Sequence, residues 1–341
     1  MPHVAVVILN WNGKRYLEQF LPSLIERTGS KAEIVVADND SSDDSVVFLE
    51  RNYHFLRIIR NPGNMGFATG YNMALRQIDA EYFVLLNSDI EVTAGWLDPI
   101  IRLMEGDTKI GACQPKILSW HDRSAFEYAG ASGGFLDQFG YPFCRGRLFQ
   151  TLEKDQGQYD DTTEIFWASG ACMFVRSDLY HQLGGLDDDF FAHMEEIDFC
   201  WRLHNHGFKV MVCPSSVVYH IGGGTLPKAS WRKTYLNFRN NFMLLYKNLP
   251  RRQLIKVFAI RWILDGIAAG KFLFQAGFKD FWAVARAHLS FYKALPSLRK
   301  KRKALKHGSM KMIYRNVIVF EYYLRGIRHF SRLRKEHFSQ E

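Results

Sequence analysis

Short apolar runs alternate with helical segments along residues 4–90, and this alternation constrains the fold more than any other feature. The runs are rich in Val, Ile and Leu, which is typical of strands buried on both faces. Strands separated by helices at this spacing form βαβ units, which build a mostly parallel, doubly wound sheet. We predict strands at residues 4–9, 32–37, 56–59 and 82–86, and helices at 16–25, around 46–49 and at 68–77.

Polar clusters follow three of these predicted strands, at the point where each strand ends. Residues 10–13 follow the first strand, residues 38–43 the second and residues 87–89 the fourth. In doubly wound sheets, ligands bind beyond the carboxyl ends of the strands. The topology therefore predicts a ligand site at this edge of the sheet.

Asp89 is the acidic residue of the third cluster. It follows the strongest apolar run, after Asn87 and Ser88, and no Lys or Arg stands beside it. Oxygen ligands of this kind suit Mg²⁺ or Mn²⁺, which share their coordination with substrate phosphates. The alternative is a structural role in which Asp89 caps the following helix.

A second group of acids lies between residues 187 and 198, beside apolar side chains. Partial burial and neighbouring like charge raise the pKa of a carboxyl group toward the working pH, as a general base requires. A solvated acidic loop that caps a helix at 197–206 is the alternative. His220 precedes the glycine run 222–224, and a lone His is structural more often than not, so its significance depends on these acids.

The remaining elements are less regular. Residues 119–165 are rich in Gly, Asp and aromatic side chains and predict a long excursion over the sheet edge, and such long loops are usually functional or mobile. Further strands are expected at 165–175 and 209–212. From residue 230 the pattern is helical throughout, with breaks at Pro250 and Pro296. We therefore expect an α/β domain at 1–225 and an α-helical extension at 226–341.

The net charge of +9 conceals a division between these two parts. Residues 1–224 contain 18 Lys and Arg against 30 Asp and Glu, a net charge of −12. Residues 225–341 contain 26 against 5, a net charge of +21. This asymmetry favours contact of the basic part with a polyanion, either nucleic acid or an anionic membrane. A solvated charged face is the alternative.

Two features of the basic part favour a membrane surface. Residues 257–274 are too interrupted, by Arg261, Asp265 and Lys271, for a spanning helix. They predict an interfacial helix with apolar residues on one face and charges on the other, or else a buried amphipathic helix. The basic run 299–303 with Lys306 adds a second signal for reversible attachment to anionic lipid.

Cysteine usage and the start of the chain indicate the compartment. The five cysteines are odd in number and lack CxxC spacing, which favours a reducing environment without disulfides. We see no signal peptide before the first strand. We therefore expect a cytoplasmic protein, attached peripherally to the inner face of the plasma membrane.

Six motifs in order make the chain resemble the family 2 glycosyltransferases of the GT-A fold, particularly bacterial rhamnosyltransferase-like members. The likeness covers about residues 4–225 and continues more weakly into the tail. It implies the fold of nucleotide-diphospho-sugar transferases, here with a C-terminal α-helical extension. The matching pieces are residues 6–13, 36–43, 61–70 with Asn72, 86–89, 170–173 followed by 184–187, and the acidic stretch with His220.

The resemblance also implies roles for individual residues. Asp38 would accept a hydrogen bond from a uracil or thymine ring. Asp89 would be the last acid of the metal motif, whose first acid is replaced by Asn87, and His220 would be a further ligand of Mn²⁺ or Mg²⁺. Glu196 stands at the position of the catalytic base, with Glu195 and Asp198 close enough to compete. The rest of the donor pocket would comprise Leu9, Asn10, Trp11, Asn64, Gly66 and Ser88.

On this resemblance we expect a metal-dependent, inverting glycosyltransferase of cell-surface polysaccharide synthesis. The donor would be a dTDP- or UDP-linked sugar, with rhamnose the first choice. The acceptor would be a hydroxyl of a glycan or of a polyprenyl-diphosphate-linked molecule. Residues 239–241 in the tail could guide such a lipid-linked acceptor, or belong to a helical lid packed on the domain.

Other functions are weaker. A dinucleotide-binding oxidoreductase would carry GxGxxG after the first strand, and this chain does not. A nucleic-acid-binding protein that uses its basic, aromatic tail stays open, although we expect no nucleic acid among the partners. A GT-A protein that binds sugar nucleotides without catalysis also stays open, and the intact acidic positions argue against it.

Overall fold

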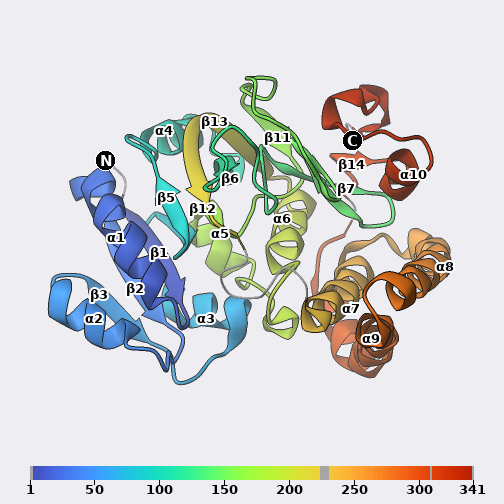
Figure 1. Cartoon of the computed structure of the whole chain (residues 1–341), viewed down its shortest axis with the longest axis horizontal. Helices are drawn as coiled ribbons and strands as arrows, with labels where there is room; N and C mark the ends of the chain where they lie inside the picture. Colours follow the sequence, from blue (N-terminus) through green and yellow to red (C-terminus); the bar gives the residue numbers. More distant parts are fainter. Residues whose placement is uncertain (1–2, 223–229, 308, 340–341) are drawn as a thin grey trace.

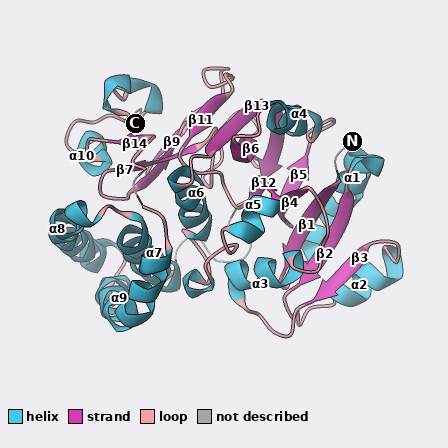
Figure 2. Cartoon of the chain, turned by 180° about the vertical axis from the view of Figure 1, so that it is seen from behind, coloured by secondary structure: helices cyan, strands magenta, loops and turns pink. Residues whose placement is uncertain are grey.

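The computed structural model describes residues 3–222, 230–307 and 309–339. Within them, a nine-stranded sheet and a five-stranded sheet organise the chain. Figures 1 and 2 show the larger sheet running from β3 at one end to β11 at the other. Its strands, in spatial order, are β11 (Thr163–Ile165), β13 (Lys209–His220), β6 (Ile110–Ser119), β12 (Cys172–Arg176), β4 (Tyr82–Asn87), β1 (Val4–Asn10), β2 (Glu33–Asp38) and β3 (Arg57–Arg60), while β5 (Ile90–Val92) pairs with β13.

The larger sheet is parallel in its N-terminal half and mixed beyond it. β3, β2, β1 and β4 are parallel, as the sequence predicts, and so are β6 and β13. β12 runs antiparallel between β4 and β6, because the excursion after β6 leaves and re-enters the sheet at the same edge. The sheet is thus less parallel than predicted, but the carboxyl ends of β1, β2 and β4 share one edge.

Helices cover both faces of this sheet. Successive side chains of β1 enter different cores: Val6 packs in one hydrophobic cluster and Val7 in the other. This follows from the alternation of side chains along a strand. The face of Val6 is covered by α1 (Lys14–Thr28), α2 (Ser45–Asn52) and α4 (Asp98–Gly106), and that of Val7 by α3 (Gly66–Leu75), α5 (Ser177–Gln182) and α6 (Glu195–Asn205).

The excursion predicted at 119–165 supplies most of the second sheet. The last strand of the second sheet comes from the C-terminal part of the chain, where Ile313 pairs in parallel with Leu136. The strand predicted at 165–175 is wrong in one respect, because β11 and β12 are separate strands joined by the loop 166–171. The second sheet contains, in order, β10 (Thr151–Leu152), β9 (Arg147–Leu148), β8 (Pro142–Cys144), β7 (Gly134–Asp137) and β14 (Ile313–Tyr314).

Three long helices, α7 (Trp231–Asn248), α8 (Arg251–Gln275) and α9 (Phe278–Ala304), follow the larger sheet and lie together on the side away from β1–β3 (Figure 1). Pro250 precedes α8 as predicted, but Pro296 lies inside α9, and the actual break is at Gly277, whose φ is 93°. The tail is not helical throughout, because β14 and short elements follow α9. The short elements of the chain are α10 (Ile318–Tyr323) and the 3₁₀ turns Gly29–Lys31, Asp188–Phe190, Phe330–Arg332 and Lys335–His337. The expected domain boundary at 225/226 and the glycines 223 and 224 lie outside the described residues.

The sequence analysis left helix α8 as either an interfacial helix or a buried amphipathic one, and the structure shows which face packs on the protein. Two of its charged residues face inward: Arg261 and Asp265 are buried, with Arg261 Nε 3.1 Å from Asp265 Oδ1, and His288 Nε2 lies 3.2 Å from Asp265 Oδ2. Its outward residues are apolar, with exposed fractions of 86% for Ile255 and 89% for Phe274. Periodicity distinguishes two faces of a helix but does not say which one packs on the protein. We call the exposed set Ile255, Trp262, Ile263, Ile267 and Phe274 the apolar outer face.

Candidate active site

A cavity of about 560 Å³ lies at the carboxyl ends of β1 and β4, where the topology predicts a ligand site. Its size is within the range of small-molecule binding sites. Residues that are far apart in the sequence, from 9–89 and from 195–220, meet at this cavity. The predicted site residues that line the cavity are Leu9, Trp11, Asn64, Gly66, Asn87, Ser88, Asp89, Glu195, Glu196 and His220.

Asn10 and Asp38 do not line the cavity. Both are buried, and Asn10 Nδ2 donates a hydrogen bond of 2.9 Å to the Asp38 carboxylate, which also accepts one of 2.9 Å from the Ser41 backbone N–H. These bonds fix the loop after β2 beside the loop after β1. The neighbouring Asn39, which the sequence analysis did not select, reaches the cavity instead. The predicted contacts of Asn10 and Asp38 with a donor base stay predictions.

Asp198 is not a candidate base, which corrects the sequence analysis. Its carboxylate is fully buried and accepts hydrogen bonds from Arg202 Nε at 2.9 Å and Asn248 Nδ2 at 2.8 Å. Lys247 Nζ lies 2.8 Å from the same carboxylate. Asp198 is in the same first turn of α6 as Glu195 and Glu196, but it does not line the cavity and contacts α7 instead. It therefore holds the two helices together.

Asp89 and His220 meet at the edge of the sheet because β5 and β13 pair there. His220 Nε2 lies 3.1 Å from Asp89 Oδ1, and Asn87 Nδ2 is 3.5 Å from the same nitrogen. On the other side of the ring, His220 Nδ1 lies 3.1 Å from an oxygen of Glu127. Glu127, in the loop after β6, is buried and was missed by the sequence analysis, because nothing in its local sequence marks it.

The charges of Asp89, Glu127 and His220 shift one another's pKa values. Burial would lower the pKa of His220, but the carboxylates of Asp89 and Glu127 on its two sides raise it well above its usual value. Burial would raise the pKa of Asp89 and of Glu127, but the charge of His220 and its hydrogen bonds lower both. Without a further cation, His220 is therefore an imidazolium between two carboxylates.

The donor set fits a divalent cation only in part. Among the residues that the structure describes, no three His, Cys, Asp or Glu side chains are placed to hold a metal together. Two side chains face a common position, the Asp89 carboxylate and His220 Nε2, while Glu127 lies behind the ring. Two protein ligands suffice for Mg²⁺ or Mn²⁺ when diphosphate oxygens and water complete the coordination. In this arrangement Glu127 would orient the imidazole, as carboxylates behind metal-bound His commonly do.

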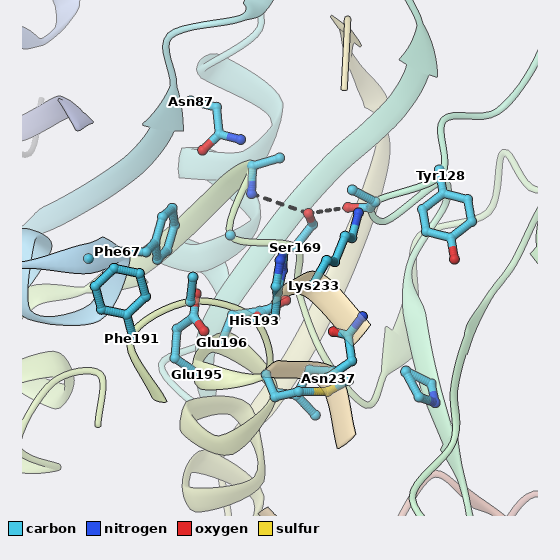
Figure 3. A pocket seen from close by; sticks show the side chains of 18 of the residues that line it. Phe67, Asn87, Tyr128, Ser169, Phe191, His193, Glu195, Glu196, Lys233 and Asn237 are labelled. Carbon is cyan, nitrogen blue, oxygen red and sulfur yellow. Dashed lines mark hydrogen bonds between the residues drawn. The ribbon is translucent and has the colours of Figure 1, made fainter. Parts of the chain in front are cut away.

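Glu195 and Glu196 project from the first turn of α6 into the cavity. Figure 3 shows them between Phe191 on one side and His193 on the other. Burial raises the pKa of Glu196 to about 7. Burial, then the charge of Glu196, raises the pKa of Glu195 well above its usual range. Glu196 is the better candidate for the general base, since a base works best with a pKa near the working pH.

An unusual turn presents these acids. Phe191, His193 and Met194 all have positive φ, at 65°, 71° and 76°, a conformation that costs free energy for non-glycine residues. Asn240 of α7 stabilises the turn, because its Nδ2 lies 2.8–2.9 Å from the carbonyl oxygens of Phe190, Ala192 and His193. The sequence analysis left residues 239–241 either to guide the acceptor or to belong to a helical lid packed on the domain. The contacts of Asn240 with the acidic turn agree with the second alternative, and the first stays a prediction.

Comparisons with known proteins agree with this geometry. The family model described as "Glycosyl transferase family 2" matches residues 5–184. The N-acetylglucosaminyl-diphospho-decaprenol L-rhamnosyltransferase of Mycobacterium tuberculosis is 26% identical over 233 residues, which cover 64% of this chain and 75% of the relative.

Two solved structures share the fold. Staphylococcus aureus TarS 1–349 in complex with UDP-GlcNAc has a TM-score of 0.56 at 16% identity, covering 88% of this chain and 83% of that chain. Mannosyltransferase PcManGT from Pyrobaculum calidifontis, in complex with GDP-Man and Mn²⁺, has a TM-score of 0.52 at 15% identity, covering 87% and 76%. The fold is therefore GT-A-like, with a central curled sheet and C-terminal helices. With the family model matching more than half of its length, the chain belongs to glycosyl transferase family 2 and is similar to its rhamnosyltransferases.

Proposed function

We propose that this glycosyltransferase inverts the anomeric centre of a dTDP- or UDP-linked sugar, rhamnose being the first choice, as it transfers the sugar to an acceptor hydroxyl. One observation carries the proposal: Glu196, with a pKa of about 7, lines the same cavity as Asp89 and His220. A base on one side of a reacting centre and diphosphate-binding groups on the other are what a single displacement needs.

The residues act on the proton, the sugar and the diphosphate separately. Glu196 accepts the proton of the acceptor hydroxyl as its oxygen attacks the anomeric carbon. Asp89 and His220 would hold Mn²⁺ or Mg²⁺, which when bound offsets the charge of the departing diphosphate. The rings of Phe67 and Phe191 line the same cavity and add apolar surface to it.

The name of one relative supports a proposal for the acceptor class. The mycobacterial relative is named for a diphospho-decaprenol-linked substrate. We propose a polyprenyl-diphosphate-linked acceptor here as well, or a glycan built on one, in cell-surface polysaccharide synthesis. Such an acceptor lies in a membrane, which requires the enzyme to work at its surface.

Inversion can be tested without knowing the acceptor. A panel of dTDP- and UDP-sugars is incubated with the full chain and Mn²⁺, and the donor that releases nucleoside diphosphate is identified. Proton NMR then records the anomer that forms first from this donor by slow hydrolysis. We expect the inverted sugar. Release of the sugar with its original configuration would contradict the mechanism, and absence of release from every donor would favour a non-catalytic binding protein.

We also propose peripheral attachment to the cytoplasmic face of the plasma membrane through the apolar outer face of α8. Among the described helices, none has the length and mean hydropathy to cross a bilayer. The apolar outer face is bordered by exposed Arg252, Lys256 and Lys271. Apolar side chains ringed by basic ones bind the interface of anionic membranes. Of the basic run, Lys301 pairs with Asp187 and Arg302 donates to backbone carbonyls, so these two serve the protein rather than lipid.

The double variant Ile263→Glu/Phe274→Glu should bind anionic vesicles roughly tenfold more weakly or worse, since each side chain loses apolar burial in the interface. Vesicle flotation of the full chain measures the effect. Val47→Glu, at a side chain 44% exposed on α2, is the matched control. Equal flotation of the double variant and the control would refute this attachment, and retention on duplex DNA instead of vesicles would favour a nucleic-acid partner.

A further inference from the structure

The cavity wall contributed by the second sheet and α7 carries cations that the proposed chemistry does not use. Arg147 of β9 and Arg232 and Lys233 of α7 line the same cavity as the catalytic carboxylates. Figure 3 shows Lys233 and Tyr128 on the side of the cavity opposite Phe67 and Phe191. The guanidinium of Arg147 stacks on the ring of Tyr128 at 4.4 Å, and Lys233 Nζ lies 5.9 Å from the same ring.

Arg147 is the most informative of these residues. It is only 6% exposed, and its Nε has no hydrogen-bond partner. Its other nitrogens make long contacts, 3.3 Å to the Phe149 carbonyl and 3.4 Å to Cys144 Sγ. Within the described part of the chain, no carboxylate oxygen lies within 4.0 Å of this guanidinium. A buried guanidinium without an anionic partner is costly unless a ligand supplies the anion.

Neighbouring arginines show the contrast. Arg145, two residues earlier, pairs with Asp161 at 2.5 Å, and Arg261 on the same cavity wall pairs with Asp265. Arg232 resembles Arg147 in having no carboxylate in reach among the described residues, but it is exposed, and its guanidinium lies 5.4 Å over the ring of Phe191, across the cavity from Tyr128. Two cations without acidic partners thus face the cavity from different elements.

We propose that Arg147, with Arg232 and Lys233, forms a subsite for the diphosphate of the acceptor, separate from the Asp89–His220 position that serves the donor. The inference rests on the proposed function and adds where the acceptor binds. Guanidinium groups bind phosphate oxygens with strong, charge-assisted hydrogen bonds. Tyr128, Phe149 and Phe238 line the cavity beside these cations and offer apolar contacts to the first prenyl units. An acceptor held there presents its sugar to Glu196.

The subsite can be probed with geranyl diphosphate, a soluble prenyl diphosphate. The full chain is first saturated with dTDP and Mn²⁺, so that the donor position is occupied, and geranyl diphosphate is then titrated by calorimetry. We expect Arg147→Gln and Arg232→Gln each to weaken this binding by roughly tenfold or more, because a charge-assisted contact is lost. The affinity for dTDP should not change. Arg51→Gln, an exposed arginine of α2, is the charge-matched control.

The outcomes separate this inference from the proposed function. Binding of geranyl diphosphate to either variant as tight as to Arg51→Gln would overturn the subsite, while donor hydrolysis in the same preparations still reports the transferase. A parallel loss of dTDP affinity would also overturn it, since the cations would then serve the donor. Inorganic pyrophosphate should bind more weakly than geranyl diphosphate, and equal affinity would overturn the assignment to a prenyl ester. Arg232 is exposed, so its variant tests the proposal even if Arg147→Gln folds poorly.

Discussion

Replacing Glu196 with Gln is expected to lower kcat by roughly 10²- to 10⁴-fold, the usual contribution of a general base. The substitution keeps the shape of the side chain but removes the group that accepts the acceptor's proton. Binding of dTDP with Mn²⁺ should be unchanged, because Asp89 and His220 are untouched. Single-turnover transfer and calorimetry on the same preparation measure the two effects separately.

The two neighbouring acids are the matched controls for this variant. Glu195→Gln should cost much less activity, because burial and the charge of Glu196 raise the pKa of Glu195 and disfavour its carboxylate form. Asp198→Asn should act mainly on stability, since it weakens the buried contacts with Arg202 and Lys247. A loss in Glu195→Gln as large as in Glu196→Gln would move the base to the neighbouring position.

The pKa of Glu196 gives this expectation a pH dependence. Transfer requires the carboxylate, so kcat should rise with pH along an acid limb centred near pH 7. Stability changes in the opposite direction. The pKa of about 7 in the folded chain exceeds the ordinary glutamate value of 4.5, so the folded chain holds an extra proton between these two pH values and stability falls as pH rises through this window. Glu196→Gln should therefore raise the free energy of unfolding at pH 8 by on the order of 1–2 kcal/mol, which is measured as a higher Tm. Below pH 4 the Tm should be unchanged.

Replacing Asp89 with Asn is expected to abolish the Mn²⁺-dependent part of dTDP binding and to lower turnover by roughly 10²- to 10³-fold. The amide keeps the shape of the side chain, but it removes the negative charge that faces the position shared with His220. Calorimetric titration of dTDP with and without Mn²⁺ is the measurement. If Mn²⁺ still strengthens dTDP binding to Asp89→Asn by the wild-type factor, the cation binds elsewhere.

A substitution of Glu127 tests the same cation site, with a smaller expected effect. Glu127→Gln leaves both proposed ligands in place but weakens the hold on the His220 ring, so Mn²⁺ affinity should fall by roughly 10- to 100-fold. Glu26→Gln, at an exposed position of α1, serves as the control. A Glu127→Gln protein with the Mn²⁺ affinity of the control would show that this carboxylate does not orient the imidazole.

The part of the site at the carboxyl ends of β1, β2 and β4 could be predicted from the sequence, because it follows from the topology of the sheet. Runs of β-branched residues fix β1, β2 and β4, and parallel strands bring their polar carboxyl ends, including Asp89, to one edge. The acids at 195 and 196 came from their resemblance to a family motif. Asp198 was included wrongly, because three carboxylates within four residues look alike in a sequence while α6 turns one of them toward Lys247.

Other parts of the site could not be predicted, because they depend on contacts between distant segments. Glu127 acquires its role only when the loop after β6 reaches His220, and Asn240 only when α7 packs beside the turn 191–194. β14 is two residues long and carries no strand pattern of its own. The orientation of α8 depends on a buried network of Arg261, Asp265 and His288, whose members come from two helices.

The pairing of β14 with β7 has a consequence for how the protein is made. The ribosome synthesises β7, β8 and β9 before α7, α8 and α9. The second sheet is incomplete until Ile313 of β14 has followed these helices and can pair with β7. Until then Leu136 has no parallel neighbour, and the wall that carries Arg147 is unfinished. Biosynthesis therefore leaves the parallel strands β1–β4 able to form first, while the second sheet is completed last.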